Sequence, residues 1–342
     1  METMDQMLLS GWCNVLSSVP PSYVQLPEDR PVGKVFSSSS REIPMVDLGR
    51  HDRGDIIKQI LKASKEYGFF QVTNHGVSKD LIDETLNILK EFHAMPSKEK
   101  VNECFKDPNR NCKIYTSRNN DKPYEILIWK DTLTHPCPPS GEYVEYWPQK
   151  PTKYREVVGK YTSELNKLAL EILELLGEGL ELDNGYFCGA LSENPSISVN
   201  HYPPCPDPSL TLGVPIHKDP SIITILLQDE EVQQGLQVLK DGQWIGVEPI
   251  PHVFVVNIGL LLQIITNGRL VAAEHRVVTN SSRARTSVAY LMYPSSECII
   301  EPAQAFINGS PSATYKPMSF GEFRAKYLLK GYKQIEEELH IN

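Results

Sequence analysis

The spacing of apolar residues in the first third of the chain alternates between helical and extended patterns. Residues 56–67 repeat apolar side chains at helical spacing, and Gly68 ends that stretch. Short strands are predicted before and after it, over residues 44–48 and 69–72. Ser78 is placed to cap a second amphipathic helix that continues to residue 92. This part of the chain therefore has an α/β pattern.

The longest predicted helix covers residues 154 to about 182. Its apolar positions recur every three to four residues: Val157, Val158, Tyr161, Leu165, Leu168, Ala169, Ile172, Leu173, Leu175 and Leu176. Helical spacing returns over residues 320–339. Helices from both ends of the chain are therefore expected to frame whatever lies between them.

Between these helices the pattern changes to short β-rich runs separated by turn residues. The runs cover residues 197–202, 222–227, 236–239, 244–247, 254–258, 276–279 and 286–293. Runs of this length and spacing favour a double-sheet jelly roll or a barrel. The predicted fold class is therefore mainly β with flanking helices. We expect one continuous domain over 1–342, with an N-terminal α/β part (1–190), a jelly-roll core (191–300) and a C-terminal helical lid (301–342).

Charge and cysteine content limit the expected partners and compartment. Lys and Arg number 34 against 43 Asp and Glu, and the net charge of -9 argues against binding to nucleic acid or anionic lipid. The seven cysteines contain no C-x-x-C pair, which suits a reducing compartment. The N-terminal stretch resembles neither a secretory signal nor a membrane span. We expect a cytoplasmic protein with a small-molecule partner, and a monomer as the default.

Candidate metal ligands stand two residues apart in a predicted extended segment. His217 and Asp219 would project from the same face, and His275, after several strands, could supply a third ligand. Two histidines and one carboxylate are typical of iron(II) oxygenases, although zinc hydrolases use the same ligand types. His-x-Asp also arises by chance, so a surface histidine in a loop stays open as the alternative.

A second pair of side chains at the same spacing suits an anion. Arg285 offers a planar, permanently charged fork, and Ser287 adds a hydroxyl beside it. The pair could hold the far carboxylate of a dicarboxylic acid. Asn200 and Tyr202 add polar groups on one face of the strand that precedes the metal motif. Taken singly, such an arginine is more often solvated and such a tyrosine more often part of a core.

With these residues the chain resembles the plant 2-oxoglutarate-dependent dioxygenases over almost its whole length. The shared motifs occur in the family's order: GFFQVTNHG at 68–76, NHYPPCP at 200–206, HKDP at 217–220, GQW at 242–244, EHRV at 274–277 and RTS at 285–287. Residues 129–133 and 257–260 look most like the hyoscyamine 6β-hydroxylase branch. The layout is also similar to flavone synthases and salicylate hydroxylases.

The resemblance implies a fold, two cofactors and a reaction. It implies a double-stranded β-helix, or jelly roll, with Fe(II) held by His217, Asp219 and His275. It further implies that 2-oxoglutarate chelates the iron while Arg285 and Ser287 hold its other end. Tyr202 and Asn200 would line the pocket. Dioxygen and 2-oxoglutarate would yield succinate and carbon dioxide while a substrate C–H bond is hydroxylated, with ascorbate in support.

The substrate stays open between two classes. The likeness to the hyoscyamine hydroxylase branch favours an alkaloid. Residues 114–123, expected to border the pocket, are flanked or occupied by Lys113, Arg118 and Lys122 against the single Asp121. Recognition of a cationic amine is not obvious there, so a flavonoid or a phenolic acid is the alternative.

Two other protein classes compete with the dioxygenase. One is a catalytically silent jelly-roll protein that binds a small ligand; retention of all the candidate ligands counts against it. The other is a zinc or manganese enzyme on a similar roll, which has no use for an Arg-x-Ser anchor.

Lys218, between two candidate ligands, is expected to point away from them as a solvated lysine.

Overall fold

Two β-sheets form the centre of the protein. The computed structural model describes residues 8–31, 43–105, 111–118, 126–307 and 313–341. The larger sheet has the strand order β1-β2-β10-β7-β12-β5-β4-β3, and the smaller has the order β6-β11-β8-β9. The strands of the larger sheet are β1 (Met45–Asp47), β2 (Phe69–Thr73), β3 (Lys113–Thr116), β4 (Asp131–Pro136), β5 (Ser196–Tyr202), β7 (Ile223–Gln228), β10 (Phe254–Ile258) and β12 (Arg285–Leu291). Those of the smaller sheet are β6 (Val214–His217), β8 (Leu236–Lys240), β9 (Gln243–Val247) and β11 (His275–Val277).

From β5 to β12 the chain crosses repeatedly between the two sheets. It passes from β5 in the larger sheet to β6 in the smaller one and returns to β7. It then pairs β8 with β9 in the smaller sheet, returns to β10, crosses again to β11 and ends in β12 of the larger sheet. β7 and β10 are buried along their whole length, because helices cover one side of their sheet and the smaller sheet covers the other. This alternation is a jelly roll, and it confirms the predicted fold class.

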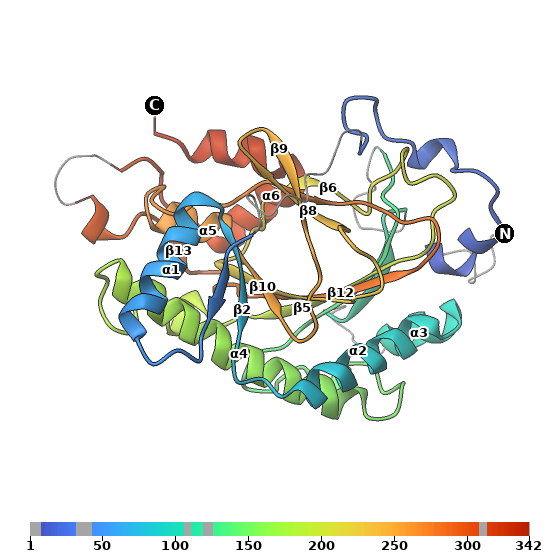
Figure 1. Cartoon of the computed structure of the whole chain (residues 1–342), viewed down its shortest axis with the longest axis horizontal. Coiled ribbons are helices and arrows are strands. Elements are labelled where there is room, and N and C mark those ends of the chain that lie inside the picture. The colour runs from blue at the N-terminus through green and yellow to red at the C-terminus, as the bar shows by residue number, and fades with distance from the viewer. Residues whose placement is uncertain (1–7, 32–42, 106–110, 119–125, 308–312, 342) are drawn as a thin grey trace.

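Three long helices cover the outer face of the larger sheet: α1 (Arg53–Glu66), α2 (Lys79–Ala94) and α4 (Tyr154–Gly179). Figure 1 shows them along one side of the sheet, while α6 (Phe320–Leu339) lies near β6 and β8 on the other side. Shorter elements are α3 (Ser97–Cys104), α5 (Leu260–Ile265), β13 (Ile299–Ile300) and β14 (Met318–Ser319). The predicted helices at 56–67, 78–92, 154–182 and 320–339 are confirmed.

The start of α2 differs in detail from the prediction. Ser78 is the N-cap residue, but its side chain makes no capping hydrogen bond. In α1, by contrast, the Asp52 side chain accepts a hydrogen bond from the backbone N–H of Asp55 at 3.1 Å. Position alone therefore identified the cap of α2, while the capping interaction expected of a serine is absent there.

Four strands from the first half of the chain extend the larger sheet. β1 pairs with β2, which lies beside β10, and β3 pairs with β4, which lies beside β5. The N-terminal part and the later strands therefore share one hydrogen-bonded sheet. Residues 119–123 of the segment expected to border the pocket lie outside the described residues.

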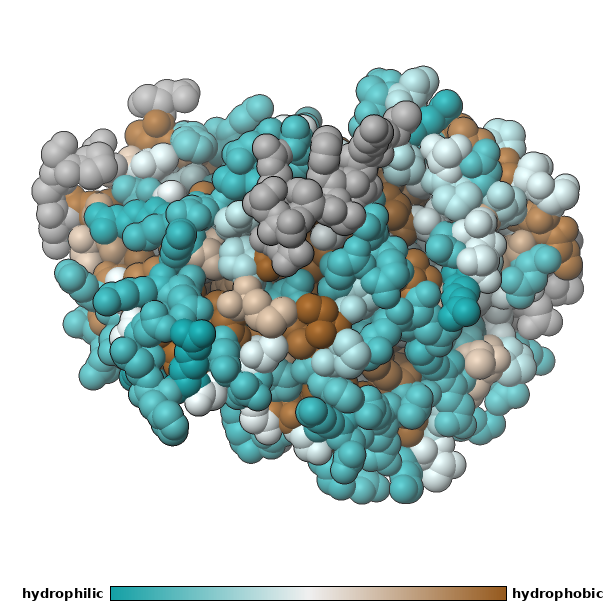
Figure 2. Space-filling view, in the orientation of Figure 1, coloured by the Kyte–Doolittle hydropathy of each residue, from teal (hydrophilic) through white to brown (hydrophobic). Residues whose placement is uncertain are grey.

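The surface in view is mostly polar. Figure 2 shows apolar side chains as small separate patches among polar ones. In the described part of the chain, no helix is both long and apolar enough to cross a bilayer.

Candidate functional site

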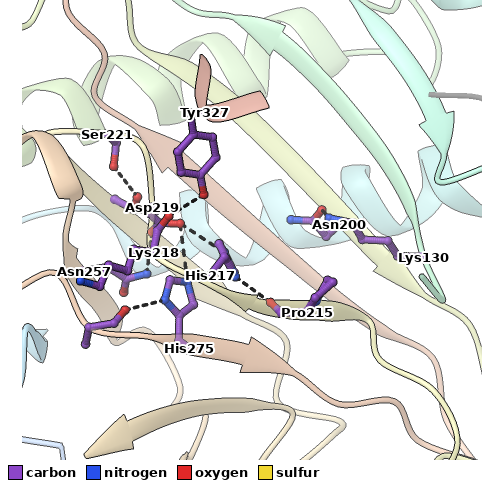
Figure 3. A network of polar contacts seen from close by, with 12 residues as sticks. Lys130, Asn200, Pro215, His217, Lys218, Asp219, Ser221, Asn257, His275 and Tyr327 are labelled. Atoms are coloured by element: carbon purple, nitrogen blue, oxygen red, sulfur yellow. Dashed lines mark hydrogen bonds and ion pairs between the residues drawn. The ribbon is translucent and has the colours of Figure 1, made fainter. Parts of the chain in front are cut away.

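Two histidines and an aspartate converge where the paired strands β6 and β11 of the smaller sheet meet the cavity. His217 ends β6 and His275 begins β11, and the two are direct partners in the antiparallel register. Asp219 follows two residues after His217, and its Oδ1 lies 3.4 Å from His217 Nε2 and 3.5 Å from His275 Nε2. One ligand atom from each residue falls within 4.8 Å of the others. Figure 3 shows the three side chains pointing toward one another. A single metal ion fits between them.

Both imidazoles are held in the form that can bind a metal. His217 Nδ1 donates to the carbonyl of Pro215 at 2.9 Å, and His275 Nδ1 donates to the carbonyl of Ala273 at 3.1 Å. A carbonyl oxygen only accepts, so each Nδ1 carries the proton and each Nε2 presents a lone pair. Backbone carbonyls therefore fix the tautomer before any ion arrives.

The protonation states of the cluster also suit a cation. Burial, with His275 alongside, lowers the pKa of His217. For Asp219, burial acts to raise the pKa, but the neighbouring His275 and His217 outweigh it and hold the pKa well below its usual range. A neutral imidazole at His217 and an ionised carboxylate at Asp219 are the states that coordinate a metal, so neither of these two ligands has to lose a proton on binding near neutral pH.

The carboxylate of Asp219 is oriented from the larger sheet. Asn257 at the end of β10 donates through Nδ2 to Asp219 Oδ2 at 3.0 Å, while the backbone N–H of Leu260 donates to the Asp219 carbonyl at 2.8 Å. Oδ1 is thereby turned toward the histidines. Asn257 entered the sequence analysis only as part of a family motif. A single amide inside the apolar run FVVNI was the available signal, because a buried amide needs a polar partner.

The four residues expected to hold a dicarboxylic acid share one face of two paired strands. In the β5–β12 register Arg285 lies opposite Tyr202, and Ser287 lies opposite Asn200. Arg285 is only 2% exposed and its guanidinium lies 5.2 Å from the centre of the Tyr202 ring. Pairing in register brings these residues to one wall of the roll.

Part of the Arg285 guanidinium has no hydrogen-bond partner among the described residues. Its Nη2 donates to Gln228 Oε1 at 2.8 Å, but Nε and Nη1 are buried without a hydrogen-bond partner in the described structure. Two unpaired buried N–H groups on a planar cation are costly unless an anion occupies them. A ligand carboxylate fits this arrangement.

The amide of Asn200 has a fixed orientation. Its Oδ1 accepts hydrogen bonds from Lys130 Nζ at 2.9 Å and from Thr132 Oγ1 at 3.0 Å. Since both partners donate, the oxygen must face them and the Nδ2 donors face away. Lys130 and Thr132 belong to β4 and its flank, and sequence reasoning did not place them at the site.

Both constellations line one cavity of about 500 Å³. Its wall includes the metal cluster, the Arg285 face and apolar side chains such as Ile216 and Leu291. Helix α6 contributes Tyr327, Leu328, Gly331 and Tyr332 to the rim. Helix α6 therefore borders the cavity.

Contacts at three points connect α6 to residues that adjoin the metal cluster in sequence. Lys218 Nζ donates to both carboxylate oxygens of Glu336, at 2.7 and 2.9 Å, and Tyr327 donates to the Lys218 carbonyl at 2.6 Å. Tyr332 donates to Glu274, which precedes His275. Lys218 points away from the cluster as expected, but it is not a solvated lysine, because its side chain is only 14% exposed within this pair.

Family models match two parts of the chain. Residues 193–294 match the 2OG-Fe(II) oxygenase superfamily, and residues 43–154 match the model described as non-haem dioxygenase in morphine synthesis N-terminal. The two matches cover the roll and the N-terminal strands and helices that flank it.

Individual proteins are similar over nearly the full chain. Hyoscyamine 6-dioxygenase of Hyoscyamus niger is 42% identical over 91% of each chain. Flavanone 3-dioxygenase 2 of Oryza sativa subsp. japonica is 37% identical over 94% of this chain and 93% of its own. The crystal structure of JOX2 in complex with 2OG, Fe and JA aligns with a TM-score of 0.84 at 34% identity, over 96% of this chain and 95% of that one. The chain belongs to the plant 2-oxoglutarate- and iron(II)-dependent dioxygenases.

Proposed function

We propose that the 500 Å³ cavity is the active site of a hydroxylase acting on a small specialised metabolite. In this proposal His217, Asp219 and His275 hold iron(II), Arg285 and Ser287 hold the far carboxylate of 2-oxoglutarate, and Tyr202 and Asn200 line its subsite. One observation carries the proposal: the preset histidine tautomers and the unpaired donors of Arg285 face the same cavity.

Each residue set has a separate task. Iron(II) with 2-oxoglutarate and dioxygen supplies oxidation of a substrate C–H bond, with succinate and carbon dioxide as co-products. The three side chains would hold the iron from one side and leave it accessible to the keto acid and to dioxygen. Arg285 and Ser287 set the direction of the keto acid along the β12 wall. Apolar side chains, with the rim from α6, exclude water from the substrate.

The substrate stays a choice between classes at this level. The relatives' names point to hyoscyamine in one case and to a flavanone in another. We propose an alkaloid or, as the alternative, a flavonoid or phenolic acid. A silent binder is disfavoured because the unpaired donors of Arg285 and the metal-ready triad have no evident use in it.

Succinate formation tests the proposal. Purified protein is incubated under air with iron(II), ascorbate and 2-oxoglutarate, alone and with tropane alkaloids, flavonoids, coumarins and phenolic acids. We expect succinate that depends on iron and 2-oxoglutarate and rises with one substrate class, together with incorporation of one oxygen atom from ¹⁸O₂. His217→Ala should abolish it, whereas His51→Ala, at an exposed position, should not. No succinate from protein that has bound iron would favour the silent binder.

We also propose a cytoplasmic monomer in which residues 1–342 act as one dioxygenase unit, with neither nucleic acid nor a membrane as partner. All seven cysteines are free, which supports a reducing compartment. The excess of acidic residues supports the absence of a nucleic-acid partner. Sedimentation of the purified protein at two concentrations tests the monomer.

A further inference from the structure

Lys130 is a half-buried cation that the proposed reaction does not use. Its side chain lines the cavity, and with the described residues its ammonium makes one hydrogen bond, to Asn200 Oδ1 at 2.9 Å. No carboxylate of the described residues lies within 4.0 Å of Lys130 Nζ. An ammonium has three donors, so two remain after the bond to Asn200. Even a half-buried cation is energetically costly when a neutral amide is its one partner among the described residues.

The charges around the cavity do not balance once both cofactors are counted. Among the described residues, the charged side chains of the wall besides the imidazoles are Asp219, Arg285 and Lys130. Iron(II) with Asp219 leaves one positive charge. That charge together with Arg285 matches the two negative charges of 2-oxoglutarate. The ammonium of Lys130 is then left as one unmatched positive charge in a partly enclosed cavity.

We propose that Lys130 binds an anionic group of the primary substrate, so that the substrate is a small monocarboxylic acid. This inference rests on the proposed function and narrows its substrate class. A cationic amine would be repelled by the charge of Lys130. Among the described residues of the wall, no carboxylate is available to pair with such an amine, because Asp219 binds the metal in this proposal. The partly apolar remainder of the wall, including Ile216, Leu291 and Leu328, suits a hydrophobic body carrying that acid.

Burial is in keeping with this role. It lowers the pKa of Lys130 to about 8, so the ammonium is still mostly protonated at neutral pH. A bound carboxylate favours the charged form and would raise that pKa again. Binding of the acid should therefore be coupled to protonation of Lys130.

A carboxylate near Lys130 could instead belong to 2-oxoglutarate, and Lys130 could act only by orienting Asn200. Three variants separate these roles. Lys130→Met removes the charge at similar length, Lys130→Arg keeps it, and Thr132→Val removes the other donor to Asn200 without changing charge. Thr132→Val is the matched control for an effect transmitted through Asn200.

Binding is measured by calorimetry under nitrogen, with iron(II) and saturating 2-oxoglutarate. The probes are acids with their primary amides: indole-3-acetate and indole-3-acetamide, 4-coumarate and 4-coumaramide, and salicylate and salicylamide. We expect the wild type to bind at least one acid about tenfold or more tightly than its amide, the value of one charge-assisted hydrogen bond. Lys130→Met should lose that preference, while Lys130→Arg and Thr132→Val keep it.

Three results would overturn the inference: no acid preferred by the wild type, a preference that survives in Lys130→Met, or a preference lost equally in Thr132→Val. Titration with 2-oxoglutarate alone gives a fourth contradicting result. If Lys130→Met binds 2-oxoglutarate more weakly but keeps the preference for the acid, the ammonium binds the co-substrate. Succinate formation dependent on iron and 2-oxoglutarate is measured in the same preparations. If it persists while the acid preference is absent, only this inference fails; if it is absent too, the proposed function fails.

Discussion

The amide of Asn257 donates to Asp219 Oδ2 at 3.0 Å and so leaves Oδ1 to face the two histidines. Asn257 itself is 3% exposed and lies one residue before the end of a strand that is buried along its length. The carboxylate is thereby held by the larger sheet while both imidazoles belong to the smaller one. This contact determines which carboxylate oxygen of Asp219 is free to coordinate a metal.

Replacing Asn257 with Leu should weaken iron binding by about 10- to 100-fold, because groups that orient a ligand contribute that much to metal affinity. Iron titration of the apo protein measures it. Asn166→Leu makes the same chemical change on α4, where the amide accepts from Tyr290, and should leave iron affinity unchanged. Equal iron affinity in Asn257→Leu and wild type would show that the contact does not position the carboxylate.

Replacing Arg285 with Met should raise the Kd for 2-oxoglutarate by roughly 100-fold, since charge-assisted bonds to the co-substrate are lost. The apo variant should unfold at no lower temperature than the wild type, because a buried cation with unpaired donors is removed. Thermal unfolding with and without 2-oxoglutarate tests both statements. Arg283→Met, two residues earlier and exposed, is the control, and 2-oxoglutarate should stabilise it as it does the wild type.

Gly235→Ala offers an independent test of the same subsite. A Cβ at Gly235 would lie 2.8 Å from Arg285 Cδ and 2.9 Å from its Nε, so the guanidinium must move. We expect weaker 2-oxoglutarate binding without any change in charge. Gly242→Ala serves as a control for added bulk, because nothing lies within 4 Å of a Cβ there, although its φ of +73° carries some strain. Unaltered 2-oxoglutarate binding in Gly235→Ala would contradict the placement of Arg285.

Lys218→Met should loosen α6, because it removes the pair with Glu336 that ties the helix to the metal-flanking strand. The pair is only partly exposed, so its loss should speed amide hydrogen exchange in residues 332–339 by about tenfold. Lys326→Met removes more exposed pairs with Glu322 and Glu338 on the same helix and should change exchange little. Similar exchange in the two variants would argue against a special role for the Lys218 pair.

Acid should destabilise the fold through buried histidines. Burial lowers the pKa of His135 and of His201 to about 4, against a usual value of 6.5. The unfolded chain therefore binds protons on these imidazoles at a higher pH than the folded chain does. Stability is fully present above pH 6.5 and falls as the pH drops toward 4, by on the order of 3 kcal/mol for each imidazole.

Urea unfolding at a series of pH values between neutral and about 4.5 measures this loss. His135→Gln should flatten the dependence on pH, while the exposed His51→Gln controls for the substitution itself. If the free energy of unfolding of His135→Gln depends on pH as steeply as that of the wild type, His135 does not contribute to the acid sensitivity.

The sequence predicted those elements whose periodicity extends over many residues. The 26 residues of α4 repeat an apolar face throughout, and the burial of that face matches the pattern. α5 was missed because all six of its residues are buried, so no face is distinguished. α3 was missed for the opposite reason, since its sequence SKEKVNEC is mostly polar. In β6, Pro215 and a length of four residues concealed a strand.

Site residues were predictable where chemistry repeats at a fixed spacing. The pairs at 217 and 219 and at 285 and 287 share a face, and the structure brings each pair to the cavity. Lys130 and Glu336 carried no such signal, because their partners lie 70 and 118 residues away in the chain. Whether a lysine is solvated or buried depends on that tertiary pairing, which local sequence does not encode.

The two sheets meet at the proposed iron site, since the histidines come from β6 and β11 while Asp219 is held by Asn257 of β10. A bound ion is then a cross-link between the layers, and the free energy of binding it also resists their separation. Depletion of iron is expected to make local opening of the jelly roll more frequent as well as to stop turnover. The lifetime of the enzyme in a cell, and not only its rate, would then follow the iron supply.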